Sequence, residues 1–256
     1  MIAVTDYIEV NGVRTWYDER GGGEPLVLLH GGFSDAREFT GNLDTLAERF
    51  RIFTPDRRGH GHTPDVAGPI TLDLMVEDMI AFIGKAVGEP VHLVGYSIGA
   101  TVALLIALRR PELVRRLVLI SGGFHHSGWI FTPAAGGEMP ERVVAAYAEV
   151  SPDGRDHFPV VAAKIVEAAV ADPLSLTEAE LAGIAARTLV MAGDDDIVHL
   201  EHTLALYRAV HGSELAVVPG TSHLLLHEKP DLCARLVTDF LTKDPVLTFI
   251  PIRRAP

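Results

Sequence analysis

The chain has 256 residues, of which 48% are hydrophobic and 22% charged, an ordinary composition for a globular protein. Its 34 acidic and 22 basic residues give a formal net charge of −12, which argues against nucleic acid or an anionic membrane surface as the main partner. The single cysteine, Cys233, excludes an internal disulfide framework and a cysteine-based metal site. Its place in an amphipathic helical pattern indicates core packing.

Nothing in the first residues predicts export or membrane insertion. Residues 1–20 carry acidic and basic side chains in place of the apolar core of a signal peptide. No apolar run reaches the roughly 18 residues that a membrane-spanning helix requires. We therefore expect a cytoplasmic protein.

Strand and helix patterns alternate along the first half of the chain. Short apolar runs predict strands at residues 7–10, 13–18, 26–29, 51–54, 91–95 and 116–120. The first two are joined by Asn11-Gly12, a strong signal for a two-residue hairpin. Apolar residues at helical spacing predict helices at residues 35–49, 71–87 and 98–109, the second with Thr71 as its N-cap.

The alternation returns near the C-terminus, where we expect strands at residues 188–191 and 215–218 and helices at 201–210 and 230–241. Strands separated by helices predict βαβ units. The expected fold is therefore α/β, with a mostly parallel sheet, an antiparallel first hairpin and helices on both faces.

One stretch breaks the alternation. Residues 122–186 show no convincing strand and hold helical patterns near 140–150, 157–171 and 177–186. A helical block inserted between two strands of a parallel sheet is typical of a lid over the carboxyl edge of the sheet, where open α/β sheets bind ligands. The expected organisation is a core of residues 1–121 and 187–243, a helical cap of residues 122–186, and a C-terminal tail of residues 244–256.

Ser97 is the leading candidate for a nucleophile. The segment Gly95-Tyr96-Ser97-Ile98-Gly99 follows an apolar strand and opens an apolar helix. In that context G-x-S-x-G forms a sharp strand-to-helix turn that lifts the serine hydroxyl above the sheet. The two glycines remove side chains that would clash in the turn, and the helix N-terminus favours developing negative charge.

A serine hydroxyl needs a base, and His223 is the leading candidate. It follows the last predicted strand, so it lies at the same sheet edge as Ser97. His227, four residues later, is the local competitor, although the leucines between them favour a turn that points it away.

Two further loops reach the same edge. Asp194, Asp195 and Asp196 follow the strand before the one leading to His223, and any of the three could orient its imidazole. The loop His30-Gly31-Gly32-Phe33 follows a buried strand. One of its backbone amides, together with that of Ile98, would form an oxyanion hole, since glycines let the backbone approach a substrate closely.

In this order the motifs resemble those of the α/β-hydrolase superfamily, in the branch of capped serine hydrolases that includes esterases, perhydrolases and enol-lactone hydrolases. The resemblance covers residues 5–243 and also draws on the segment 56–63, Asp-Arg-Arg-Gly-His-Gly-His-Thr, a structural turn in that family. It implies a triad of Ser97, Asp196 and His223, because the family's acid lies three residues after the glycine that ends the strand. It further implies oxyanion amides at Gly32, with Phe33 as the alternative, and at Ile98.

The resemblance implies a serine hydrolase that cleaves a small, fairly apolar carboxylic ester or lactone through an acyl-enzyme, without metal or organic cofactor. Relatives that dehalogenate or open epoxides carry aspartate at the position of Ser97, so serine argues against those reactions. Carbon–carbon bond hydrolysis, perhydrolysis and hydroxynitrile cleavage stay open. A slow-turnover ligand receptor is the alternative from another class of protein.

Aromatic residues near the predicted site indicate an apolar pocket of modest size. Its expected lining residues are His30, Phe33, Tyr96, Phe124, Trp129 and Phe131. Three histidine pairs, 60/62, 125/126 and 199/202, have spacings that permit metal binding. The first pair lacks a third ligand nearby in sequence and belongs to the segment 56–63. The second pair lies at the cap hinge, where it could line the pocket, and the third opens a helix, which favours a solvated face, so we expect no metal site.

The C-terminal tail is too apolar to remain free in solution. Residues 246–252 read Val-Leu-Thr-Phe-Ile-Pro-Ile. We expect this segment to pack on the body of the chain or on a neighbouring subunit, the latter making a homodimer.

Overall fold

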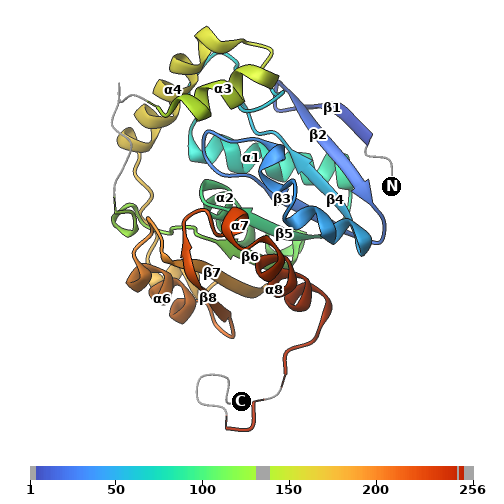
Figure 1. The fold of residues 1–256 in the computed structure, drawn as a ribbon, viewed down its shortest axis with the longest axis vertical. Helices are drawn as coiled ribbons and strands as arrows, with labels where there is room; N and C mark the ends of the chain where they lie inside the picture. The colour runs from blue at the N-terminus through green and yellow to red at the C-terminus, as the bar shows by residue number, and fades with distance from the viewer. Residues whose placement is uncertain (1–3, 131–138, 247, 251–256) are drawn as a thin grey trace.

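The computed structural model describes residues 4–130, 139–246 and 248–250. Eight strands form one sheet in the order β1-β2-β4-β3-β5-β6-β7-β8 (Figure 1). β1 pairs with β2, and β2 with β4, in antiparallel fashion, while all other pairs are parallel. This confirms the predicted α/β fold. The strands are β1 (Val4–Val10), β2 (Val13–Gly21), β3 (Glu24–Leu29), β4 (Phe50–Pro55), β5 (Val91–Tyr96), β6 (Val114–Ile120), β7 (Arg187–Asp195) and β8 (Glu214–Ser222).

The first hairpin forms where predicted. Asn11 and Gly12 have φ values of 49° and 78°, and positive φ at both central residues is the requirement of a type I′ turn. Val10 pairs directly with Val13 across this turn. The hairpin therefore follows from two residues of local sequence.

The sheet separates two apolar layers because neighbouring residues of a strand point to opposite faces. Val27 and Leu29 of β3 pack in one layer, while Leu26 and Leu28 pack in the other. The first layer is covered by α1 (Leu72–Phe82), α2 (Ile98–Arg109) and α6 (Leu200–Ala209). The second is covered by α7 (Leu225–Glu228) and α8 (Pro230–Thr242), which include the buried Cys233.

Residues 35–49 differ from the single helix that their spacing predicts. They form two 3₁₀ helices, η1 (Ala36–Phe39) and η2 (Leu43–Glu48). Gly41 between them has a φ of 79°, which a helix cannot contain, and the Asn42 side chain accepts a hydrogen bond from the Leu43 amide. A glycine followed by a capping residue thus divides the segment.

β7 and β8 extend further than predicted. Asp195 pairs with Ser222 beyond a register shift in β7, so Asp194 and Asp195 lie in a strand instead of a loop. The extension depends on pairing between segments 27 residues apart in sequence. Local apolar patterns carry no signal for such pairing.

Helices α3 (Glu141–Val150), α4 (Phe158–Ala171) and α5 (Glu178–Leu181) lie within the predicted helical patterns. α3 and α4 stand together at one end of the molecule (Figure 1). Charged contacts join them to segments that connect the strands: Arg37 of η1 lies 2.7 Å from Glu149, and Lys164 lies 2.6 Å from Asp65. Only 6% of the Asp65 side chain is exposed.

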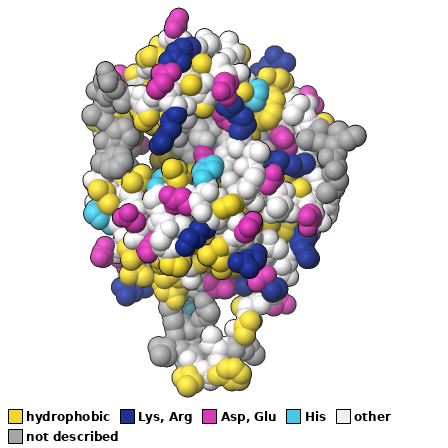
Figure 2. All heavy atoms as spheres, viewed as in Figure 1, with side chains coloured by type: hydrophobic (Ala, Val, Ile, Leu, Met, Phe, Trp, Pro, Cys, Tyr) yellow, Lys and Arg dark blue, Asp and Glu magenta, His cyan; other side chains and the backbone are white. Residues whose placement is uncertain are grey.

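The described part of the tail lies away from the body. Val246, Phe249 and Ile250 have exposed fractions of 84%, 104% and 84%, and Figure 2 shows apolar side chains at the tail below the body. The predicted packing on the body is therefore not seen for these three residues, and packing on a partner subunit stays a prediction. Within the described ranges, no helix combines the length and apolarity needed to cross a membrane.

Candidate active site

Ser97 occupies a strained turn between β5 and α2. Its φ and ψ are 56° and −121°, a backbone conformation that residues other than glycine rarely adopt. A Cβ atom on Gly95 would lie 2.2 Å from the carbonyl oxygen of Gly99, and one on Gly99 would lie 2.1 Å from that of Leu29. Only glycines therefore let this turn close against the neighbouring strand.

Three side chains at the carboxyl edge of the sheet form one hydrogen-bonded line. The Oγ atom of Ser97 lies 3.0 Å from Nε2 of His223. Nδ1 of the same ring lies 2.7 Å from Oδ1 of Asp196. These distances are those of a nucleophile, a general base and an acid that orients the base.

The Asp196 carboxylate is held on both oxygens. Oδ1 also accepts the Val198 amide at 3.1 Å, and Oδ2 accepts the hydroxyl of Ser121 at 2.5 Å. Burial favours the neutral acid, yet the hydrogen bonds from His223, Ser121 and Val198 outweigh it, so the pKa of Asp196 is lowered. The group therefore stays ionised beside the imidazole at neutral pH.

Sequence analysis did not identify Ser121 as a residue of the site. It follows β6 with a φ of 51° and is 1% exposed. The only hint in the sequence is a serine at the end of a strand that reaches the same sheet edge as Ser97.

The other candidates for base and acid have different partners. Asp194 and Asp195 are exposed, and Oδ1 of Asp194 accepts the Thr221 amide at 3.0 Å. His227 has 46% of its side chain exposed and lies 2.6 Å from Glu38. That hydrogen bond to Glu38 raises the pKa of His227.

The glycine loop after β3 packs tightly against the serine turn. A Cβ atom on Gly31 would lie 3.5 Å from Cβ of Ser97, and one on Gly32 would lie 3.3 Å from the Ile98 side chain. Phe33 follows with a φ of 55°. Of the predicted oxyanion residues, Gly32 thus packs against Ile98, the residue after the nucleophile, and Phe33 follows in the same loop.

A buried arginine supports this loop from behind. The Arg57 side chain donates to the carbonyl oxygen of Gly31 at 2.7 Å, and the Arg57 amide donates to Nε2 of His30 at 3.1 Å. Burial lowers the pKa of Arg57 to about 9, which still leaves it cationic at neutral pH. His30, predicted as a pocket residue, is fully buried in this network.

The remaining predicted pocket residues lie in different surroundings. The Tyr96 hydroxyl donates to the His223 carbonyl oxygen at 2.7 Å, and the Trp129 ring meets the His223 ring edge-on with centroids 6.0 Å apart. Phe124 is 6% exposed and stacks on His202. Phe131 lies outside the described residues.

The three histidine pairs have structural partners. His60 is buried beside the Arg58 carbonyl oxygen, His62 bonds Asp56, and Nε2 of His202 accepts the Phe124 amide. The rings of His125 and His126 contact each other with centroids 4.1 Å apart and planes tilted by 31°. Among the described residues, no group of three or more histidine, cysteine, aspartate or glutamate side chains could hold a metal ion.

The strain at Ser97 leads to a stability prediction. Ser97→Gly should raise the free energy of unfolding by about 1 kcal/mol, because relief of the strained turn exceeds the chain entropy that glycine adds. Ser97→Ala loses the same hydroxyl but keeps the strain, so it is the matched control. Urea unfolding of the two variants measures the difference, and equal midpoints would contradict a strained turn.

Comparisons with known proteins agree on one family. Residues 26–236 match the model described as the alpha/beta hydrolase family. The chain is 31% identical over 230 residues to an AB hydrolase superfamily protein of Gibberella zeae, covering 84% of this chain and 79% of that protein. It is 27% identical over 262 residues to the 2-hydroxymuconate semialdehyde hydrolase of Pseudomonas sp. (strain CF600), covering 91% and 92%.

A solved structure leads to the same family. Est816, described as an N-acyl homoserine lactone degrading enzyme, is 25% identical to this chain. The match covers 91% of this chain and 99% of Est816, with a TM-score of 0.73. Since the family model spans most of the sequence and the sheet has the order given above, the chain belongs to the alpha/beta hydrolase family.

Proposed function

We propose that the protein is a serine hydrolase that cleaves a small, fairly apolar carboxylic ester or lactone. The observation that carries the proposal is the line of hydrogen bonds from Ser97 through His223 to Asp196, at 3.0 and 2.7 Å. A serine hydroxyl is a weak nucleophile until a base of this kind removes its proton.

In the proposed reaction His223 Nε2 takes the proton as Ser97 Oγ attacks the substrate carbonyl carbon. Asp196 fixes the ring tautomer and stabilises the imidazolium that forms. The amides of Ile98 and of Gly32 or Phe33 stabilise the oxyanion. The imidazolium then protonates the leaving alkoxide, and water activated by the neutral ring releases the acyl group from the serine oxygen.

The apolar character proposed for the substrate is supported by aromatic side chains where the loop after β3 meets α4. Phe33 follows the predicted oxyanion amide and meets Phe158 of α4 with ring centroids 6.3 Å apart. The same two residues line a narrow pocket with Tyr147 and Val161, and the polar Ser34, Asp35 and His60 line it as well. We propose that residues 122–186 act as a cap, whose helices α3 and α4 supply this apolar wall.

The test combines labelling and turnover. A fluorophosphonate probe should label one serine per chain, and p-nitrophenyl esters from acetate to octanoate should be hydrolysed with an optimum at one chain length. Both signals should vanish in Ser97→Ala. A matched control is Ser127→Ala. Among the described residues, the Ser127 hydroxyl forms a hydrogen bond with His125 alone, so its removal should leave labelling and turnover unchanged.

Two other results would lead to different conclusions about the protein. Labelling with only a slow single turnover would favour the ligand receptor over the enzyme. Labelling that persists in Ser97→Ala would place the nucleophile elsewhere and reject the proposal.

Carbon–carbon bond hydrolysis is the second candidate. It is favoured by the 27% identity to a 2-hydroxymuconate semialdehyde hydrolase along nearly the full length of both chains. Loss of the absorbance of 2-hydroxymuconate semialdehyde on adding the enzyme, at a rate exceeding that for every p-nitrophenyl ester, would select this reaction.

A further inference from the structure

The guanidinium of Arg57 lies behind the loop that is predicted to hold the oxyanion. Arg57 has an exposed fraction of 0%, and its Nη2 atom donates to the Gly31 carbonyl oxygen at 2.7 Å. Its Nε and Nη1 atoms have no hydrogen-bond partner among the residues that the structure describes. The adjacent Asp56 attracts Arg57 electrostatically, but Oδ2 of Asp56 accepts the amide of His62 at 2.8 Å. The hydrogen bonds of this buried cation are thus concentrated on the glycine loop, although burying a charge costs free energy.

His30 supplies a second hydrogen bond to the same carbonyl oxygen. Nε2 of its ring accepts the backbone amide of Arg57 at 3.1 Å. Burial and the Arg57 charge hold the pKa of His30 well below its usual value, so the ring is neutral and carries its proton on Nδ1. Nδ1 lies 2.8 Å from the Gly31 oxygen and therefore donates to it. Arg57 Nη2 also lies 3.2 Å from Nδ1, because both atoms converge on that oxygen. Two donors thus fix the direction of one carbonyl group.

The peptide unit between Gly31 and Gly32 joins these donors to the predicted oxyanion hole. The Gly31 carbonyl oxygen and the Gly32 amide hydrogen belong to one planar trans unit, so they point in opposite directions. Because the oxygen is directed at Arg57, the amide points to the other side of the loop. A Cβ atom on Gly31 would lie 3.5 Å from Cβ of Ser97, so this unit runs beside the nucleophile. No described residue accepts a hydrogen bond from the Gly32 amide, which leaves it free to donate to a substrate.

We propose that Arg57 is a positioning residue that orients and polarises the Gly31–Gly32 peptide, so that the Gly32 amide donates to the oxyanion. A hydrogen bond to a carbonyl oxygen makes the N–H of the same peptide a stronger donor, since linked hydrogen bonds polarise one another. A donor that is fixed before the oxyanion forms also costs no reorganisation during the reaction. The inference rests on the proposed ester hydrolysis and selects Gly32 over Phe33, whose amide belongs to the next peptide unit.

The kinetic test is Arg57→Met, which removes the charge and the donors. It should lower kcat for the best p-nitrophenyl ester about tenfold, a part of the roughly 10²–10³ that is lost with a whole oxyanion donor. KM should stay within about twofold, because the guanidinium lies behind the loop and acts only on the transition state. The urea midpoint should not fall, since methionine replaces a buried cation with two unpartnered nitrogen atoms.

The state of the peptide can be measured without turnover. In a chain labelled with glycine that carries ¹³C at its carbonyl carbon and ¹⁵N, an amide-to-carbonyl correlation spectrum shows only peptide units between two glycines. The sequence holds five of these, at residues 21–22, 22–23, 31–32, 122–123 and 136–137. Gly32→Ala identifies the 31–32 signal by removing it. In Arg57→Met the ¹³C and ¹⁵N frequencies of that signal should both fall, as expected when a carbonyl oxygen loses a donor, while the other four signals stay in place.

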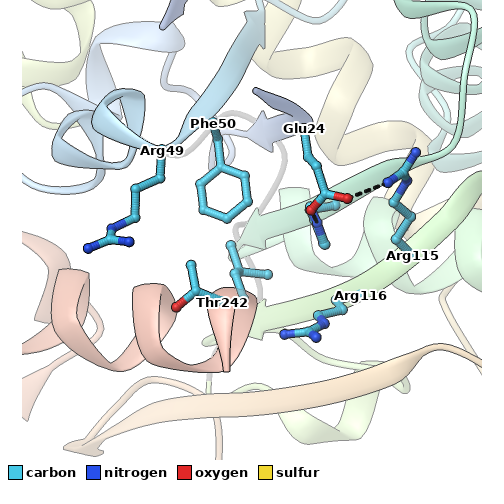
Figure 3. Close-up of a pocket in the computed structure, with 8 residues that line it drawn as sticks. Glu24, Arg49, Phe50, Arg115, Arg116 and Thr242 are labelled. Atoms are coloured by element: carbon cyan, nitrogen blue, oxygen red, sulfur yellow. Dashed lines mark hydrogen bonds and ion pairs between the residues drawn. The ribbon is translucent and has the colours of Figure 1, made fainter. Parts of the chain in front are cut away.

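Arg116→Met is the matched control. Arg116 also donates to backbone carbonyl oxygens, those of Phe240 and Lys243 at 2.8 and 3.0 Å, and it lies 3.5 Å from Asp244. It belongs to the beginning of β6, and Figure 3 shows it beside the end of α8. Ser97 lies at the opposite, carboxyl edge of the sheet. The control should leave kcat, KM and the 31–32 signal unchanged.

Arg57→Lys keeps the positive charge and a donor. Its kcat should lie between those of the unmodified chain and Arg57→Met, and its 31–32 signal should lie between theirs as well. If the methionine variant does not fold, the lysine variant carries the test, with the same directions of change in kcat and in the signal.

Failure of this inference and failure of the proposed function give different results. If the unmodified chain neither reacts with the fluorophosphonate probe nor hydrolyses esters, both are overturned. If it does both, an unchanged kcat or an unmoved 31–32 signal in the Arg57 variants overturns the role of Arg57 alone. A raised KM with an unchanged kcat would also overturn it, since that result places the arginine in contact with the substrate.

Discussion

Replacing His223 by alanine should lower kcat for ester hydrolysis by about a millionfold, as removing the base of a serine triad does in other hydrolases. Its Nε2 atom is the one described histidine nitrogen within hydrogen-bond distance of Ser97 Oγ. Without it the hydroxyl keeps its proton during attack. Steady-state turnover of the best p-nitrophenyl ester measures the loss.

His227→Ala is the matched control for this prediction. His227 lies four residues further along the chain, is exposed, and pairs with Glu38. Its removal should leave kcat within about twofold and lower stability only slightly, since exposed ion pairs contribute little. If the two alanine variants lost similar activity, the assignment of the base would be wrong.

Replacing Gly99 by alanine should destabilise the fold by about 4 kcal/mol or more, the range reserved for backbone conflicts and large core defects. The new Cβ would lie 2.1 Å from the Leu29 carbonyl oxygen and 2.4 Å from that of His30. Both are backbone atoms of the strand and loop beside the nucleophile, so neither can rotate away. The melting temperature and the urea midpoint should both fall sharply.

Gly84→Ala is the matched control, because it makes the same chemical change at a position with space for a Cβ atom. Gly84 lies in the helical turn Ile83–Val87 after α1, with nothing within 4 Å of a Cβ placed on it. Alanine there should raise the free energy of unfolding by about 0.5 kcal/mol, through better helix propensity and a less flexible unfolded chain. A loss of stability in Gly99→Ala no greater than the change in Gly84→Ala would contradict the close approach of α2 to β3.

The predictable parts of this fold depend on signals within a few residues. Asn11-Gly12 specifies its hairpin through positive φ, and the Thr71 side chain caps α1 by accepting the Leu74 amide, as predicted. The G-x-S-x-G pattern is equally local as a signal, and Gly95 is required by atoms of Gly99 and Ala100, although Gly99 is required by the carbonyl oxygens of Leu29 and His30 in a distant segment. The order of motifs then identifies the family, which the comparisons confirm.

The parts that were missed depend on contacts between distant segments. Arg57 would ordinarily be expected at the surface, and its burial follows from the position of the Gly31 carbonyl oxygen. Ser121 reaches Asp196 only because β6 and β7 are neighbours in the sheet. The residues themselves left the three adjacent carboxylates open, and only the family resemblance selected Asp196, because their different partners come from β8 and the loop after it.

The strained backbone of Ser97 also bears on the balance between stability and function. Glycine at this position is expected to give a more stable chain with the same fold, so the chain holds a serine here at a cost in free energy of unfolding. Under the proposed function, that cost belongs to the site itself, since active sites are where local rules of stability are commonly broken.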